Sequence, residues 1–176
     1  TESLSPEMML IMLQQRLRGL DSQIAMETKG IQEAAKASEA LSELIQGMAA
    51  LRDAMAAKKK KSGDDVNLNT FAFTANGVEY NPAKSFLIEH NIQDLVEGTY
   101  DADGNLVSVE DHMTRDVIIG KIETLQLQQR TINSGNEMSM VRLQAAIGQR
   151  QQAIQLTTNL VQNMNQSCLD IIRNTK

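Results

Sequence analysis

The sequence predicts a mainly α-helical protein, in which two long helices form an antiparallel coiled-coil hairpin with a small α/β insert between them. Two observations support this prediction. All five aromatic residues of the 176-residue chain fall between residues 71 and 100. Both flanks lack aromatic residues and repeat aliphatic residues at heptad spacing. A globular core normally draws large side chains from the whole chain. The chain therefore divides into an aliphatic flank, a mixed insert and a second aliphatic flank, which together make one domain.

The first flank, residues 1–62, is predicted to be one long helix. Ser5 suits the N-cap, Pro6 suits the first helical position, and Glu7 places an acid in the first turn. A heptad frame starting at position 10 puts apolar residues in 11 of its 14 seam positions. Because a long amphipathic helix is not stable alone, this seam requires a partner helix. The seam residues that we single out are Leu10, Leu13, Leu17, Leu20, Ile24, Ile31, Leu41, Ile45 and Met48.

The insert, residues 63–107, is predicted to contain two β-hairpins separated by a short helix. Alternating side chains around an Asn-Gly pair at residues 76–77 indicate the first hairpin. An Asn-Pro pair at residues 81–82 begins the helix, which should end near His90. Residues 99–107 indicate the second hairpin. The aromatic side chains should then form a satellite core that is independent of the helical seam.

The second flank, residues 108–176, is predicted to be the longer helix. Ser108 and Asp111 together resemble a capping box at its start. An apolar stripe follows, loses its phase around residues 134–136 and restarts at Met140 with a spacing of seven residues. A phase change of this kind indicates a stutter, a bend or a break in the helix.

The C-terminal helix gives the clearest functional signal. Residues 151–169 contain no charged side chain, and amides and hydroxyls fill most positions that are not apolar. An exposed helix face normally carries Glu and Lys, whereas amides suit a helix that other helices surround. We therefore expect an assembly or partner interface, and a lone hairpin with a polar outer face is the alternative. The interface residues that we single out are Met140, Leu143, Ile147, Ile154, Gln155, Asn159, Val161, Met164, Cys168 and Ile171.

Composition argues against several classes of protein. The net charge of −5 argues against a nucleic-acid partner. No apolar run approaches the roughly 18 residues of a transmembrane helix, so direct membrane insertion is not expected. The chain opens at Thr1 without a basic and apolar leader, so a cleavable signal peptide is not expected. A single cysteine, Cys168, allows neither an internal disulfide nor a cysteine-rich zinc site.

Signals of catalysis or of a bound cofactor are weak. Residues 101–105 resemble the start of a calcium loop, but Leu106 and His112 occupy the positions that require Gly and Glu. Glu110, Asp111 and His112 are metal-ligating types, but three neighbours at a helix start point in different directions, which favours capping acids. The sequence has no P-loop, dinucleotide fingerprint or nucleophile elbow. We therefore expect a protein that is not an enzyme and that holds no metal or cofactor.

The order of helix, small acidic insert and longer helix is one basis for a family resemblance. Two C-terminal segments add to it: residues 136–144 (Asn-Glu-Met-Ser-Met-Val-Arg-Leu-Gln), with the amide-rich helix that follows, and residues 171–174 (Ile-Ile-Arg-Asn). In these features the chain resembles the extracellular needle-tip and filament proteins of bacterial type III secretion systems. It is most similar to the EspA/SseB-like filament subunits.

This resemblance implies a secreted, virulence-associated translocator or filament subunit whose two helices form a coiled coil and whose copies form a homo-oligomer or filament. The implied partners are the secretion needle subunit, the translocon proteins and a cytosolic secretion chaperone that covers the coiled coil before export. The implied location is the bacterial cell surface, reached from the cytoplasm on an uncleaved signal. Two other hypotheses remain. One is a prefoldin-like cytosolic chaperone that holds clients at its helix tips, and the other is a coiled-coil adaptor bound through apolar residues 8–13.

Overall fold

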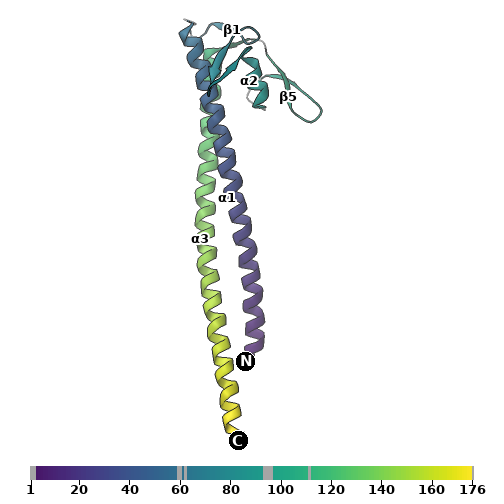
Figure 1. The fold of residues 1–176 in the computed structure, drawn as a ribbon, viewed down its shortest axis with the longest axis vertical. Coiled ribbons are helices and arrows are strands. Elements are labelled where there is room, and N and C mark those ends of the chain that lie inside the picture. Colours follow the sequence, from purple (N-terminus) through teal and green to yellow (C-terminus); the bar gives the residue numbers. More distant parts are fainter. Residues whose placement is uncertain (1–2, 59–60, 62, 93–96, 111, 176) are drawn as a thin grey trace. The chain divides into compact units, whose positions relative to one another are not determined.

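The computed structural model describes residues 3–58, 61, 63–92, 97–110 and 112–175. Two long helices, α1 (Pro6–Ala57) and α3 (Arg115–Asn174), run antiparallel and pack together (Figure 1). Short strands and the helix α2 (Lys84–Glu89) lie between them in the chain. This architecture confirms the predicted fold class. Within the described residues, no helix combines the length and the hydropathy that crossing a membrane requires.

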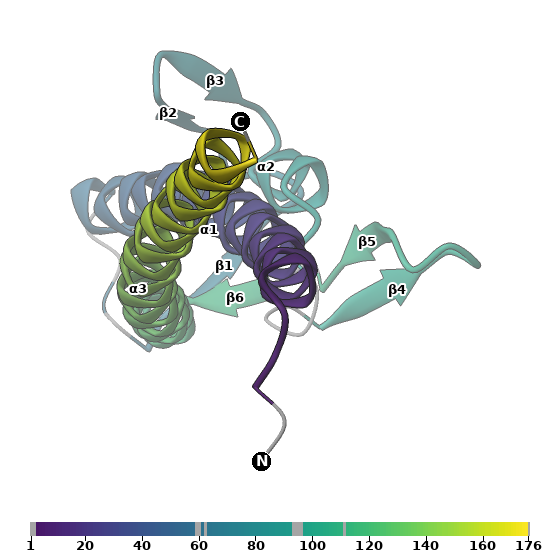
Figure 2. The same cartoon turned by 90° about the horizontal axis from the view of Figure 1, so that it is seen from below.

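The described strands pair as separate two-stranded antiparallel ladders (Figure 2). The pairs are β2 (Phe73–Ala75) with β3 (Val78–Tyr80), β4 (Gly98–Tyr100) with β5 (Leu106–Val109), and β1 (Asp65–Asn67) with β6 (His112–Thr114). The first two pairs are the predicted hairpins. Asn76 and Gly77 have φ values of 53° and 79°, as a type I′ turn requires. The β1–β6 pair was not predicted.

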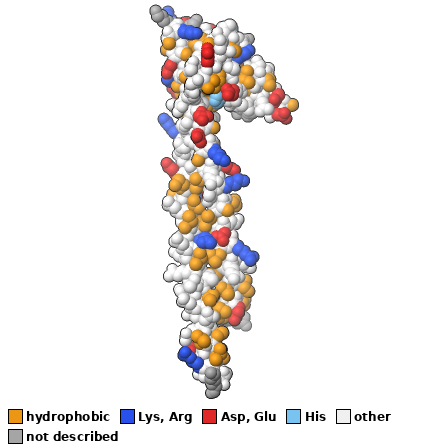
Figure 3. Space-filling view, viewed as in Figure 1, with side chains coloured by type: hydrophobic (Ala, Val, Ile, Leu, Met, Phe, Trp, Pro, Cys, Tyr) orange, Lys and Arg blue, Asp and Glu red, His pale blue; other side chains and the backbone are white. Residues whose placement is uncertain are grey.

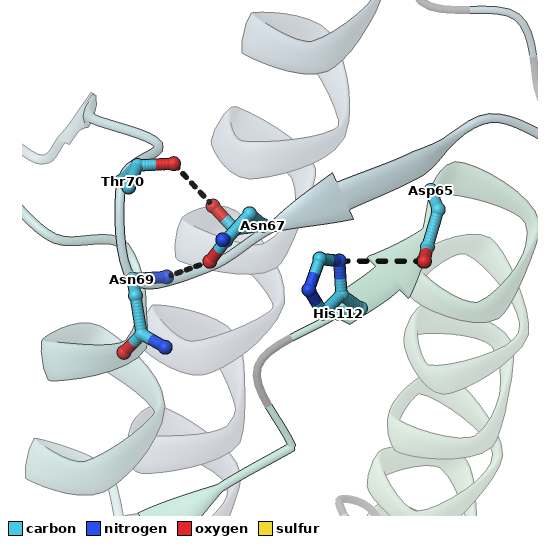
Figure 4. Close-up of polar contacts among 5 residues, drawn as sticks. All are labelled: Asp65, Asn67, Asn69, Thr70 and His112. Carbon is cyan, nitrogen blue, oxygen red and sulfur yellow. Dashed lines mark hydrogen bonds and ion pairs between the residues drawn. The ribbon is translucent and has the colours of Figure 1, made fainter.

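A polar network fixes the chain where β1 ends (Figure 4). The side-chain oxygen of Asn67 accepts a hydrogen bond of 2.9 Å from the backbone N–H of Asn69. The backbone carbonyl of Asn67 accepts one of 3.4 Å from the Thr70 hydroxyl. Asx turns of this kind reverse the chain without a regular ladder. Across the ladder, His112 Nδ1 lies 3.3 Å from Asp65 Oδ2. These contacts hold the turn that connects β1 to Phe71, a buried residue.

The two long helices begin at side-chain caps. The Ser5 hydroxyl accepts a hydrogen bond of 3.2 Å from the backbone N–H of Met8, which confirms the predicted start of the first helix. The predicted start of the second helix at Ser108 is wrong, because Ser108 belongs to β5. Its proposed capping partner, Asp111, lies outside the described residues. Instead, the Thr114 hydroxyl accepts a hydrogen bond of 3.2 Å from the N–H of Val117.

The helix α3 is continuous through residues 134–136, so the break is excluded among the three alternatives of a stutter, a bend or a break. Gly135 lies in open space and is tolerated there at a modest cost in helix propensity. Apart from Arg115, Ile119, Lys121 and Gly148, the residues that are at least half-buried alternate at spacings of four and three residues, which is the pattern of a seam. They are Ile118, Ile122, Leu125, Gln129, Ile132, Asn136, Ser139, Leu143, Ala146, Arg150, Ala153, Thr157, Leu160 and Met164.

The chain forms two compact units, which we describe separately: unit 1 (Thr1–Ala35 and Ser134–Lys176) and unit 2 (Lys36–Asn133). Unit 2 has one hydrophobic core, in which aromatic side chains of the insert pack with aliphatic side chains of both helices. Its largest fully buried members are Phe86, Met48, Leu51, Met55, Leu68, Leu87, Ile118 and Leu125. The expectation of an independent aromatic satellite core is therefore wrong.

Gly47 on α1 is a point of close approach between the insert and a long helix. A methyl group at this position would overlap the ring of Phe86. That ring packs edge-on against Phe73 and Tyr80, with centroid distances of 5.6 and 5.1 Å. The missing side chain at Gly47 thus lets the aromatic cluster join the helical core.

Candidate assembly surface

The seam of unit 1 joins the first part of α1 to the last part of α3. Leu20 is buried, whereas Leu10, Leu13, Leu17, Ile24 and Ile31 are half-buried. The other three residues of the predicted α1 seam, Leu41, Ile45 and Met48, lie in unit 2, where Met48 is fully buried. Ion pairs of Arg150 with Asp21 and of Arg142 with Glu27 (3.8 Å) hold the two helices in register. Both pairs are partly exposed, so each adds little to the stability of the hairpin. Their main effect is on which residues of the two helices lie opposite one another.

On the α3 side, the seam consists mostly of small and polar side chains. Ala146 and Ala153 are buried, and Leu143, Leu160 and Met164 are half-buried. The remaining seam positions are Asn136, Ser139, Arg150 and Thr157. The Asn136 side-chain oxygen is buried and accepts no hydrogen bond. Because stabilisation by burial scales with the apolar area removed from water, this half of the hairpin gains little from its own seam.

In unit 1, several larger apolar residues of α3 form an exposed line beside the seam. Met140, Ile147, Ile154 and Val161 are 48%, 39%, 39% and 40% exposed. We call these four residues the ridge. Each lies four residues after a seam position, so the ridge follows one flank of the seam along the helix. Cys168 continues the same line and is exposed.

The residues singled out from the sequence are thus divided between two surfaces of α3. Leu143 and Met164 belong to the intramolecular seam, and the ridge and Cys168 lie beside it. Ile171 is exposed near the end of α3. Gln155 and Asn159 are exposed on the side of the helix that faces away from the seam.

A second apolar surface, which the α3 pattern did not reveal, lies on the other flank of the seam. Leu4, Met9, Met12, Leu13, Leu156 and Leu160 line a groove of about 410 Å³, and Arg16 is its one charged lining residue. We call this surface the groove. Its signal in the sequence is the apolar run at residues 8–13, because a run longer than one helical turn must expose some of its members.

The C-terminal half of the ridge and most of the groove lie in segments without charged residues, with Arg16 as the charged residue of the groove. Residues 8–15 of α1 and residues 151–169 of α3 contain no Asp, Glu, Lys or Arg. In the space-filling view, hydrophobic side chains form patches over the helices, with charged side chains scattered among them (Figure 3). Contiguous exposed apolar surface of this kind marks a site of protein association.

The acidic residues of unit 2 show ordinary turn and strand chemistry. The Asp101 carboxylate accepts hydrogen bonds from the backbone N–H and the side chain of Asn105, which lower the pKa of Asp101. A hydrogen bond to the Glu97 carboxyl, together with its charge, raises the pKa of Glu110. Among the described residues, no group of three or more His, Cys, Asp and Glu side chains is placed to hold a metal ion.

Comparison with family models, with curated proteins and with solved structures finds no significant match to this chain. The fold and the two surfaces define its class: a helical hairpin with a small insert and with exposed apolar surface on both flanks of its seam.

Proposed function

We propose that this protein is a non-enzymatic structural subunit that self-assembles through the C-terminal part of α3. The observation that carries the proposal is the ridge, an exposed apolar line in a helix whose residues 151–169 carry no charge. Burying the exposed part of each ridge side chain is worth roughly 0.5–1.5 kcal/mol. The neighbouring amides can be buried at such an interface if they form hydrogen bonds across it, whereas charged residues would have to be desolvated.

The resemblance described above supports the further proposal that this assembly belongs to a bacterial type III secretion system. In this proposal the protein is an extracellular needle-tip or filament subunit that contacts the secretion needle and the translocon proteins. A cytosolic chaperone covers the same apolar surface before export. This requirement follows from the surface itself, because an exposed ridge and groove at cytoplasmic concentrations would cause premature association.

The groove favours one second candidate, a chaperone or adaptor that binds a client through the start of α1. Met9 and Met12 supply flexible, polarizable side chains, which suit varied apolar partners. A client-binding protein of this kind would remain a defined small oligomer at every concentration.

Sedimentation velocity over a range of concentrations tests the assembly proposal. Wild-type protein should form concentration-dependent polymers, and the double variant Gln151→Glu/Asn165→Asp should assemble at least about tenfold more weakly. These two amides flank the ridge, three residues before Ile154 and four residues after Val161. Both positions are exposed, so the changes are nearly neutral in a monomer. In an assembly they repeat in every subunit, which places uncompensated like charges in an uncharged interface.

A matched control adds the same charge elsewhere. Gln32→Glu/Gln126→Glu also converts two exposed amides to acids, but both lie outside residues 151–169. This control should assemble like the wild type. The proposal fails if the wild-type protein stays monomeric at every concentration and no needle subunit or chaperone binds α3.

A further inference from the structure

The ridge and the groove lie on opposite flanks of the intramolecular seam. Ile154 follows the seam residue Arg150 by four positions and precedes Thr157 by three. Leu156 follows Ala153 by three positions and precedes Leu160 by four. Successive residues of an α-helix are rotated by roughly 100° about its axis. These spacings therefore place Ile154 on one side of the seam and Leu156 on the other. The two surfaces therefore cannot both contact one partner helix.

The apolar pattern of α3 is that of a helix with more than one neighbour. A two-stranded coiled coil needs only the two seam rows, whereas a helix in a larger bundle carries a third apolar row beside them. In α3 the ridge is this third row, and α1 packs only on the seam. The described part of unit 1 contains no further helix that covers the ridge.

The groove has the chemistry and the spacing to receive a ridge. Met9 and Arg16 are seven residues apart on α1, with Met12 between them, and ridge residues are also seven apart on α3. Both spacings correspond to roughly 10.5 Å along a helix, so two consecutive ridge side chains match one groove. Most of the surroundings match as well, because residues 8–15 of the groove and residues 151–169, which include Ile154 and Val161 of the ridge, carry no charge; Arg16 lies at one end of the groove. An uncharged apolar surface is best covered by another, and a second copy supplies it.

We propose that the ridge of one subunit packs into the groove of a second copy of the same chain. This inference rests on the proposed function and names its contact: α3 of one subunit against the start of α1 and α3 of the next. Because the two surfaces differ, the interface is heterologous, and each added subunit presents a new free ridge or groove. Such contacts build an open-ended series, whereas a ridge paired with a ridge would stop at a dimer.

Two variants test this pairing. The ridge variant Ile147→Lys/Ile154→Lys and the groove variant Met12→Lys/Leu156→Lys each place two lysines at exposed positions. Both should remain helical by circular dichroism, since the replaced side chains are 39–55% exposed. Alone, each should be monomeric and associate at least about 100-fold more weakly than the wild type, because a buried lysine would lack a partner. The control Met26→Lys/Met138→Lys changes exposed residues outside both surfaces and should polymerise normally.

The decisive sample is an equimolar mixture of the ridge and groove variants. The intact ridge of one should bind the intact groove of the other, so the mixture should form heterodimers and nothing larger. Polymerisation of the groove variant alone, or a mixture that stays monomeric, would overturn the ridge–groove pairing and leave the proposed assembly standing. If the wild-type protein is monomeric at every concentration, both the ridge–groove pairing and the proposed assembly are wrong.

Discussion

Phe86→Ala should lower the free energy of unfolding of unit 2 by about 3–5 kcal/mol, the usual cost of removing a fully buried phenylalanine. The Phe86 side chain is 1% exposed and contacts the rings of Phe73, Tyr80 and His90. Because the core of unit 2 combines the insert with both long helices, helix content should fall together with the insert. Chemical denaturation followed by circular dichroism measures this change.

A control variant in the same unit separates burial from a general effect of truncation. Val107 is 52% exposed, so Val107→Ala should change the free energy of unfolding by no more than about 0.5 kcal/mol. If Phe86→Ala instead melts the hairpins while the helical signal keeps its wild-type midpoint, the insert has a core of its own. That result would restore the satellite core that the sequence suggested.

Gly47→Ala should destabilise unit 2 by about 1–3 kcal/mol, although alanine normally favours a helix over glycine by roughly 1 kcal/mol. The added methyl group would overlap the Phe86 ring, which is fully buried and has little room to move. The steric cost should therefore exceed the gain in helix propensity. Comparing the thermal unfolding of the variant with that of the wild type shows directly whether the change stabilises or destabilises the protein.

Gly120→Ala is the matched control, in α3 of the same unit. Nothing lies within 4 Å of the methyl group that this change adds, so only helix propensity acts. It should stabilise the protein by about 0.5–1 kcal/mol. Equal stabilisation by Gly47→Ala would contradict the close contact between α1 and the insert.

The α1 seam was predictable because its large aliphatic residues coincide with the positions that face the partner helix. Every seam position of its heptad frame is buried or half-buried, including Glu27 and Ser38. Local turn chemistry was equally informative, since Ser5 and the Asn-Gly pair at residues 76–77 act through their immediate neighbours. Such signals depend on the local sequence alone.

The α3 seam was not predictable in the same way. Periodicity identifies the most apolar row of a helix, and in the unit 1 part of α3 that row is the ridge. The row that faces α1 contains Ala146 and Ala153, whose small side chains give a weak hydrophobic signal. The apparent phase change at residues 134–136 arose from counting Met140 as a seam residue in place of Ser139.

The sequence pattern could not predict contacts between segments that lie far apart in the chain. The strands β1 and β6 have three residues each, so neither shows a period of two over a useful length, and residues 68–111 separate them in the chain. The groove likewise combines residues from the start of α1 and from α3. Only the antiparallel pairing of the two helices brings these residues together.

The central claim is that self-association buries the exposed apolar surface of unit 1, and the reactivity of Cys168 tests it most directly. Cys168 is the only cysteine of the chain, is exposed, and continues the line of the ridge. At concentrations where the protein is monomeric, a thiol reagent should modify it at the rate of a free, exposed cysteine. Where sedimentation shows polymers, the rate should fall at least about tenfold because packed helices exclude the reagent. A rate that stays constant across the same concentrations would contradict burial of this surface.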